Sequence, residues 1–131
     1  MSLSLGIDVG TSGVRTAVLT AQGDVLPMAR TDHVAQKKDY IDADGWWRAV
    51  QTCILRQIEI LWAEGFSPLD ITGIAVDGTS GTMVLTDINL RPVTRALMYN
   101  SSGFDTEAAM IARFAPDLHI TRGSASALAR A

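Results

Sequence analysis

One short segment constrains this chain more than any other: two apolar runs joined by a turn of small residues. The first run, Leu3 to Ile7, leads to the carboxylate of Asp8, and the turn follows at Gly10 to Gly13. The second run begins at Val14 and carries the cation Arg15. A carboxylate at a strand end can orient hydrated Mg²⁺, and glycines let a backbone donate N–H groups to anionic oxygens at close range. We interpret the segment as a hairpin that binds nucleotide phosphates.

This hairpin differs from the commoner phosphate-binding loops. No Gly-Lys-Ser/Thr follows at the spacing of a P-loop, and no Gly-x-Gly-x-x-Gly opens a helix. The phosphates would therefore meet a hairpin rather than a helix N-terminus. The alternative is an ordinary β-hairpin whose glycines only satisfy the geometry of the turn. Asp8 and Arg15, which flank the turn, favour phosphate binding.

Composition and charge exclude several classes of protein. The chain has 131 residues, of which 47% are apolar and 19% charged, as expected for one globular domain with a core. A net charge of −3 with scattered basic residues argues against binding nucleic acid. The apolar stretches are too short to span a membrane, and no secretion signal precedes them. The single cysteine, Cys53, lies in an apolar helical pattern and is expected to be a buried thiol in a reducing cytoplasm.

Apolar periodicity predicts an α/β fold with a mixed sheet. An antiparallel meander of three strands comes first, followed by a long helix, further strands and a second helix. The expected strands are 3–9, 14–20, 25–34 (broken at Pro27), 71–76, 82–86 and a short one ending near Tyr99; the expected helices are 45–64 and 105–114. The apolar face of the long helix is expected to comprise Trp47, Val50, Ile54, Ile58 and Leu61. Because 124–131 resembles the start of another helix with no stop signal, we expect a truncated chain.

Five segments together resemble one known family. They are the hairpin (6–15), the next turn (21–26), the acidic start of the long helix (40–47), the strand that ends at Gly78 (71–78) and the segment that ends at Asn100 (91–100). The motif Asp-x-Gly-Thr-Ser-Gly-x-Arg is shared across the actin-like ATPase superfamily. The combination resembles the N-terminal part of the FGGY carbohydrate kinases of xylulokinase-like or ribulokinase-like type. It implies a ribonuclease H-like fold, with residues 1–131 forming part of the first domain and a second domain absent.

The resemblance also implies a role for each matching residue. Asp8 would organise the metal of Mg-ATP, largely through water. The phosphates would be bound by Gly10, Thr11, Ser12, Gly13 and Arg15. The sugar, a ketose or polyol resembling xylulose or ribulose, would be bound by Asp77, Gly78, Thr79, Ser80, Asn100 and Ser101. Phosphoryl transfer depends mainly on positioning and electrostatics, so Arg15 would offset the charge that develops on the transferred group.

The sequence departs from the family pattern near the sugar. Small residues, Thr79 to Gly81, stand where many members carry bulky ones, and Ser101 and Gly103 stand where they carry Asp and Arg. The catalytic base and the adenosine pocket are expected beyond residue 131, so the full-length protein would be a sugar kinase and this segment alone inactive. A homodimer is compatible with this interpretation. The alternative is a stand-alone phosphate-binding or oligomerising remnant without kinase activity.

Other residues that often act in sites are assigned to structure. Neither histidine has a partner at metal-binding or triad spacing, so His33 and His119 are expected at the surface or in loops. The tryptophans, Trp46, Trp47 and Trp62, are expected to pack in the core; the alternative implied by the resemblance is that Trp46 or Trp47 stacks on the sugar. Arg130 is expected to be solvated.

Overall fold

A computed structural model describes residues 2–33, 42–117, 119–123 and 126–130. The chain divides into two compact units, one formed by residues 1–35 and 44–78, the other by 36–43 and 79–131. Each unit is described by itself. The expected end of the third strand at Val34 and the first residues of the acidic segment, Tyr40 and Ile41, lie outside the described residues.

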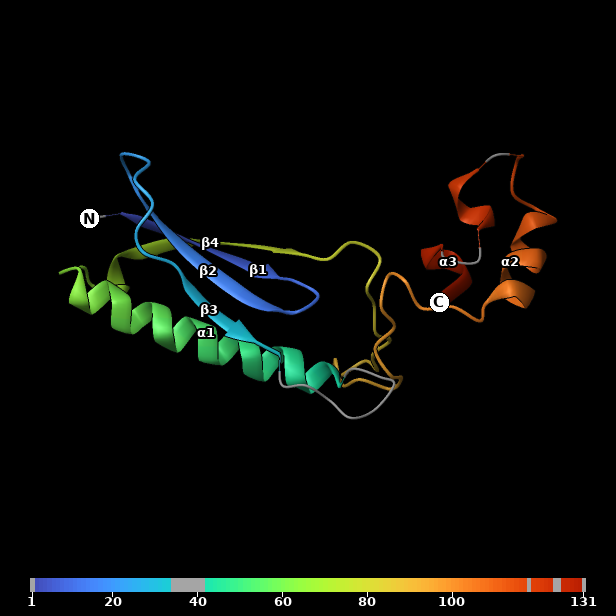
Figure 1. Ribbon diagram of the computed structural model, residues 1–131, viewed down its shortest axis with the longest axis horizontal. Helices are drawn as coiled ribbons and strands as arrows, with labels where there is room; N and C mark the ends of the chain where they lie inside the picture. Colours follow the sequence, from blue (N-terminus) through green and yellow to red (C-terminus); the bar gives the residue numbers. More distant parts are fainter. Residues whose placement is uncertain (1, 34–41, 118, 124–125, 131) are drawn as a thin grey trace. The chain divides into compact units, whose positions relative to one another are not determined.

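The first unit is built on a four-stranded mixed sheet in the order β3-β2-β1-β4 (Figure 1). Strands β1, β2 and β3 form the expected antiparallel meander, and β4 pairs with β1 in parallel. Parallel neighbours need a long crossover, which the helix α1 supplies between β3 and β4. The elements are β1 (Leu3–Val9), β2 (Gly13–Thr20), β3 (Ala29–Asp32), α1 (Ala43–Ala63), the 3₁₀ turn η1 (Pro68–Asp70) and β4 (Ile71–Gly78).

The third strand is shorter than predicted. Val25 pairs with Leu19 only through an isolated bridge, and the regular strand begins at Ala29. Pro27, which lacks a backbone N–H, separates the two parts, as its chemistry requires. The result is a bent edge segment rather than one long strand.

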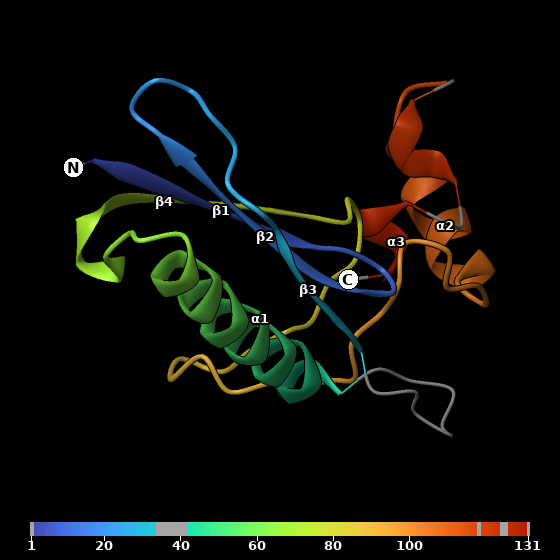
Figure 2. The same ribbon diagram turned by 60° about the vertical axis from the view of Figure 1, so that its left-hand side comes forward.

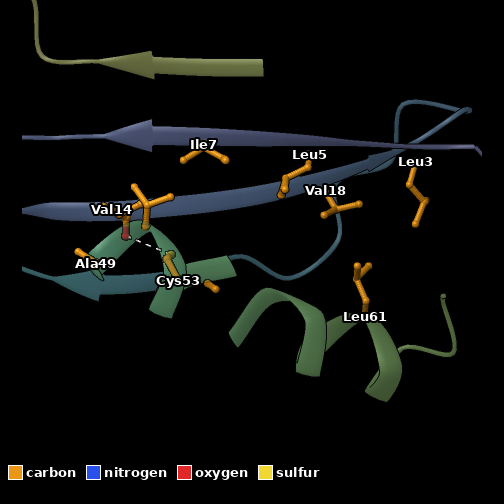
Figure 3. Packing of buried hydrophobic residues seen from close by; sticks show 10 residues of the cluster. Leu3, Leu5, Ile7, Val14, Val18, Ala49, Cys53 and Leu61 are labelled. Carbon is orange, nitrogen blue, oxygen red and sulfur yellow. Dashed lines mark hydrogen bonds between the residues drawn. The ribbon is translucent and has the colours of Figure 1, made fainter. Parts of the chain in front are cut away.

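Helix α1 runs along one face of this sheet (Figure 2). Strand side chains alternate between faces, and those that meet the helix are fully or nearly fully buried. Figure 3 shows the resulting core, to which the sheet gives Leu3, Leu5, Ile7, Val14 and Val18 and the helix gives Ala49, Val50, Cys53 and Leu61. The expected burial of the Cys53 thiol is confirmed; its Sγ donates to the carbonyl oxygen of Val14 at 3.4 Å.

The buried face of α1 agrees with the predicted one at Val50 and Leu61 and differs between them. There Cys53 and Gln57 are buried, whereas their neighbours Ile54 and Ile58 are only partly buried. The prediction of core tryptophans was wrong for Trp47 and Trp62, which are 61% and 63% exposed, while Trp46 is half-buried; the predicted Val50 and Leu61 are buried.

Gln57 is the polar centre of this core, and it is 1% exposed. Its Oε1 accepts hydrogen bonds from the hydroxyl of Thr16 and the backbone N–H of Ala29, both at 3.0 Å. Its Nε2 donates to the carbonyl oxygen of Pro27 at 2.9 Å. One side chain thus satisfies backbone groups of the bent segment before β3 and fixes it to α1.

Replacing Gln57 with leucine should destabilise the fold strongly. The change would leave the N–H of Ala29 and the hydroxyl of Thr16 buried without this partner, and each such group costs about 1–3 kcal/mol; the partly buried carbonyl of Pro27 would lose its donor as well. We expect a total loss of roughly 3 kcal/mol in the free energy of unfolding, measured by urea denaturation at constant m-value. Gln51→Leu, at an exposed position of the same helix, is the control and should shift the midpoint little. Equal midpoints for the two variants would disprove this role.

The second unit contains short helices and irregular segments. They are α2 (Asp105–Ala112), the 3₁₀ turn η2 (Ile120–Arg122) and α3 (Ala127–Arg130). The predictions of strands at 82–86 and before Tyr99 were wrong, because only isolated bridges, Met83 with Leu97 and Thr86 with Pro92, join these segments. The helix expected over 105–114 ends earlier, and the helix expected from Ser124 is described only over 127–130. Over the residues that the structure describes, no helix has the length and apolarity needed to cross a membrane.

Candidate functional site

Charged side chains form a row across the sheet of the first unit. The strand register places Arg30 of β3 beside Arg15 of β2, Arg15 beside Asp8 of β1, and Asp8 beside Asp77 of β4. Asp8 follows Ile7, which faces α1, so alternation puts this row on the opposite face of the sheet. Cations occupy the β3 and β2 end of the row and carboxylates the β1 and β4 end. This separation suits a ligand that carries both an anion and a bound cation.

Asp8 and Arg15 are paired loosely. Nη1 of Arg15 lies 3.3 Å from Oδ2 of Asp8; the side chain of Arg15 is 56% exposed and that of Asp8 is 46% exposed. An exposed ion pair of this kind contributes little to stability. Both groups are therefore accessible to a ligand at low energetic cost.

The turn Gly10–Gly13 follows β1 beside this row. The backbone N–H of Gly10 donates to the carbonyl oxygen of Gly13 at 2.9 Å and closes the hairpin. Thr11 and Ser12, at its tip, are exposed. Gly13 is buried against β3: a Cβ built on it would lie 2.4 Å from the carbonyl oxygen of Thr31. The absence of a side chain at Gly13 is thus what lets the turn pack against β3.

His33 lies in the loop after β3, one of the two positions expected for it, and it contacts the turn. Its backbone N–H donates to the carbonyl oxygen of Ser12 at 3.0 Å. Its ring atom Nε2 lies 3.0 Å from the carbonyl oxygen of Gly10, and the residue is half-buried. The other histidine, His119, is exposed and bonds to Thr121, so its expected loop position is confirmed.

Asp8 and Asp77 form the acidic end of the row. Parallel strands bring their carboxyl ends together, and the register makes these residues direct neighbours. Oδ1 of Asp77 accepts the N–H of Gly78 at 2.8 Å. Mg²⁺ is usually held by one or two carboxylates, with water and phosphate oxygens completing its shell. Asp8 and Asp77 supply such a pair of carboxylates. Residues 2–33, 42–117, 119–123 and 126–130 contain no metal-ligating cluster of three or more acidic, histidine or cysteine side chains.

The remaining candidate sugar residues belong to the second unit. Hydrogen bonds join the segment after Thr79 to the segment before Ser101: Met83 and Leu97 exchange backbone bonds of 2.9 and 2.8 Å, and Tyr99 N–H donates to the Thr82 hydroxyl at 3.3 Å. Ser101 Oγ accepts from Met98 N–H at 3.0 Å and so closes a turn. Ser80 and Asn100 are exposed, and Thr79 and Ser101 are half-buried.

Arg130 packs against these segments, and the expectation that it is solvated was wrong. It is 6% exposed, and its guanidinium donates to the carbonyl oxygens of Met98 and Ser126. Its Nη2 would lie 2.9 Å from a Cβ at Gly81, a residue whose φ of +74° also favours glycine. Buried guanidinium groups need such oxygen partners, and here they link α3 to the candidate sugar segments.

Comparison with known proteins identifies the family. The model of the N-terminal domain of the FGGY family of carbohydrate kinases matches residues 3–116. The chain belongs to the FGGY family. Its four-stranded mixed sheet, covered on one face by α1, is the FGGY form of the actin-like ATPase fold, as expected from the sequence.

The FGGY relatives of this chain include two xylulose kinases. The chain is 27% identical to the xylulose kinase of Staphylococcus xylosus over 106 residues, covering 78% of this chain and 21% of that protein. It is 25% identical to the Escherichia coli (strain K12) xylulose kinase over 125 residues, covering 92% of this chain and 25% of that protein. The crystal structure of a xyloylose kinase from Brucella ovis shares the fold, with a TM-score of 0.72 and 24% identity over 83% of this chain and 23% of that chain. The chain thus spans about a quarter of the length of the curated relatives.

Sequence reasoning about this FGGY domain missed the residues that support the site. It found Asp8, Arg15 and the turn because their residue types are diagnostic together. It did not find His33, whose contact with the turn depends on the pairing of β3 with β2. A usable signal was present: once the register of β2 and β3 is known, the pairing of Gly13 with Asp32 places the next residue, His33, opposite Ser12.

Proposed function

We propose that this chain is the N-terminal part of an ATP-dependent carbohydrate kinase that phosphorylates a hydroxyl of a ketose or polyol similar to xylulose or ribulose. The observation that carries the proposal is the row of paired charges beside the turn Gly10–Gly13. Membership of the FGGY family and the likeness to xylulose kinases support it. The coarser part, a carbohydrate-kinase domain, follows from the family itself.

In this proposal the first unit binds the phosphates of ATP. The backbone of Gly10–Gly13 and the hydroxyls of Thr11 and Ser12 donate hydrogen bonds to phosphate oxygens. Arg15 offers a fork of donors to the transferred group, where negative charge develops. Asp8 holds a hydrated Mg²⁺, with Asp77 beside it. A bound Mg²⁺ would neutralise phosphate charge and align the oxygens of the β- and γ-phosphates.

We assign sugar binding to the C-terminal end of β4 and to residues in loops of the second unit. Asp77 has a carboxylate that accepts sugar hydroxyls, and Gly78 leaves room beside it. Thr79, Ser80, Asn100 and Ser101 provide short polar groups of the kind that read hydroxyls. Because the family's usual Asp is Ser101 here, we expect weaker recognition of the hydroxyl that this carboxylate would accept. The catalytic base and the adenosine pocket are proposed to come from a part of the full-length protein beyond residue 131.

The proposal is tested by ADP release from the full-length protein. Purified protein is mixed with Mg-ATP and a panel of ketopentoses, ketohexoses, polyols and aldonates, and ADP is followed with a coupled assay. We expect turnover with at least one ketose or polyol, and a rate in the absence of sugar at least about a hundredfold lower. Absence of turnover across the panel, despite Mg-ATP binding by calorimetry, would favour the remnant without kinase activity.

A further inference from the structure

His33 binds the candidate phosphate turn at two carbonyl oxygens. Its backbone N–H donates to Ser12 and its ring Nε2 bonds to Gly10, both at 3.0 Å. A carbonyl oxygen can only accept, so Nε2 carries the proton in this contact. His33 therefore binds the carbonyl oxygens on either side of Thr11, one through its backbone N–H and the other through its ring.

The other ring nitrogen, Nδ1, shows that the burial of His33 does not satisfy all of its polar atoms. With the proton on Nε2, Nδ1 of the neutral ring is a bare acceptor, and this atom is buried without a hydrogen-bond partner among the described residues. A buried acceptor without a partner costs free energy. The fold accepts this cost at a residue whose backbone N–H and ring Nε2 both bind the turn.

The two contacts fix the direction of the N–H groups of the turn. In a planar trans peptide the N–H points opposite to the C=O of the same unit, and the residues that the structure describes include no cis peptide. Holding the carbonyls of Gly10 and Ser12 toward His33 therefore directs the N–H groups of Thr11 and Gly13 to the opposite side. Aligned N–H groups on one side of a turn form an anion-binding site.

Strand β3 holds His33 in place for this role. Gly13 packs on the backbone of Thr31 and Asp32 at distances that leave no space for a side chain. Nη1 of Arg56, on α1, donates to the carbonyl oxygen of Arg30 at 2.7 Å and to the hydroxyl of Thr31 at 3.2 Å. The position of the imidazole is thus set by the sheet and the helix rather than by a free loop.

We infer that His33 is a positioning residue that holds the turn Gly10–Gly13 in the conformation that binds the phosphates of ATP. The inference deepens the proposed function and rests on it for the identity of the ligand. His33 itself is not assigned a contact with the nucleotide. It acts by orienting the N–H groups that make those contacts.

The test compares variants of the full-length protein. His33→Leu keeps much of the volume but removes the donor, whereas His33→Gln can place an amide N–H near the position of Nε2. We expect His33→Leu to raise the KM for ATP by about five- to tenfold, as for the loss of one buried hydrogen bond, and to leave the KM for sugar within about twofold. His33→Gln should recover most of the ATP affinity. His119→Leu, at the other histidine, is the matched control and should leave both constants unchanged.

A second readout needs no ligand and no activity. Hydrogen exchange at the Gly10 amide, which closes the turn, should accelerate by a similar factor in His33→Leu and return toward the wild-type rate in His33→Gln. Equal loss of affinity for ATP and sugar, or unchanged exchange in the turn, would overturn the inference. If the wild-type protein releases no ADP with any sugar, the proposed kinase function fails, and the exchange comparison still decides the role of His33.

Discussion

Asp8→Asn should reduce turnover of the proposed full-length kinase by about a thousandfold while leaving the fold intact. The substitution keeps the shape of the side chain but removes the charge that is proposed to hold Mg²⁺ beside the phosphates. Metal ions contribute several kcal/mol of charge stabilisation to phosphoryl transfer, and about 4 kcal/mol corresponds to this factor. Because Asp8 is 46% exposed and its ion pair with Arg15 is loose, little stability should be lost.

The measurement is ADP release at saturating sugar over a range of Mg²⁺ concentrations. Asp8→Asn should lower kcat and raise the Mg²⁺ concentration needed for half-maximal rate, with an unchanged unfolding midpoint. Asp24→Asn is the control: Asp24 lies in the turn at the far end of β2, where it bonds to Thr20, and the variant should keep full activity. Normal turnover of Asp8→Asn would remove Asp8 from the metal site.

The hairpin of β1 and β2 could be predicted from sequence because its signals are local. The alternation of Leu3, Leu5 and Ile7 fixes the buried face of β1, and the small residues after it fix the turn. The same alternation fixes the face on which Asp8 lies. A site made by adjacent strands of one hairpin is therefore readable from the residues themselves.

What sequence reasoning missed depends on contacts between distant segments. Gln57 has a polar side chain, which sequence patterns place at the surface. It is buried because α1 packs over the bent segment before β3 and Gln57 bonds to that segment. Arg130 is buried only because carbonyl oxygens of Met98 and Ser126 surround its guanidinium. The error over the tryptophans arose because Trp47 and Trp62 lie beside the buried stripe of α1, and because the polar Gln57 within that stripe is invisible to apolar periodicity.

Gly13→Ala should disrupt the turn more than any other single-methyl change in the sheet. A Cβ at this position would lie 2.4 Å from the carbonyl oxygen of Thr31 and 2.9 Å from Cα of Asp32, distances that require the backbone to move. Overpacking of this kind typically costs about 1–3 kcal/mol. The φ of Gly13 is not positive, so the effect would come from the close approach of β3 and not from strain at Gly13 itself.

The displaced backbone is the one that positions the turn, so function should suffer with stability. Moving β3 away from Gly13 would also move His33 from the carbonyl of Gly10. We expect the KM for ATP to rise by more than about tenfold, beyond the effect of His33→Leu, because the packing of Gly13 on β3 is lost with the His33 contacts. Gly73→Ala in β4, where the nearest atom to a new Cβ is Ser4 Oγ at 3.9 Å, is the matched control and should change neither the ATP affinity nor the unfolding midpoint appreciably. If both variants behave alike in ATP binding and urea denaturation, the packing of the turn on β3 does not matter for phosphate binding, and the turn must be positioned from elsewhere.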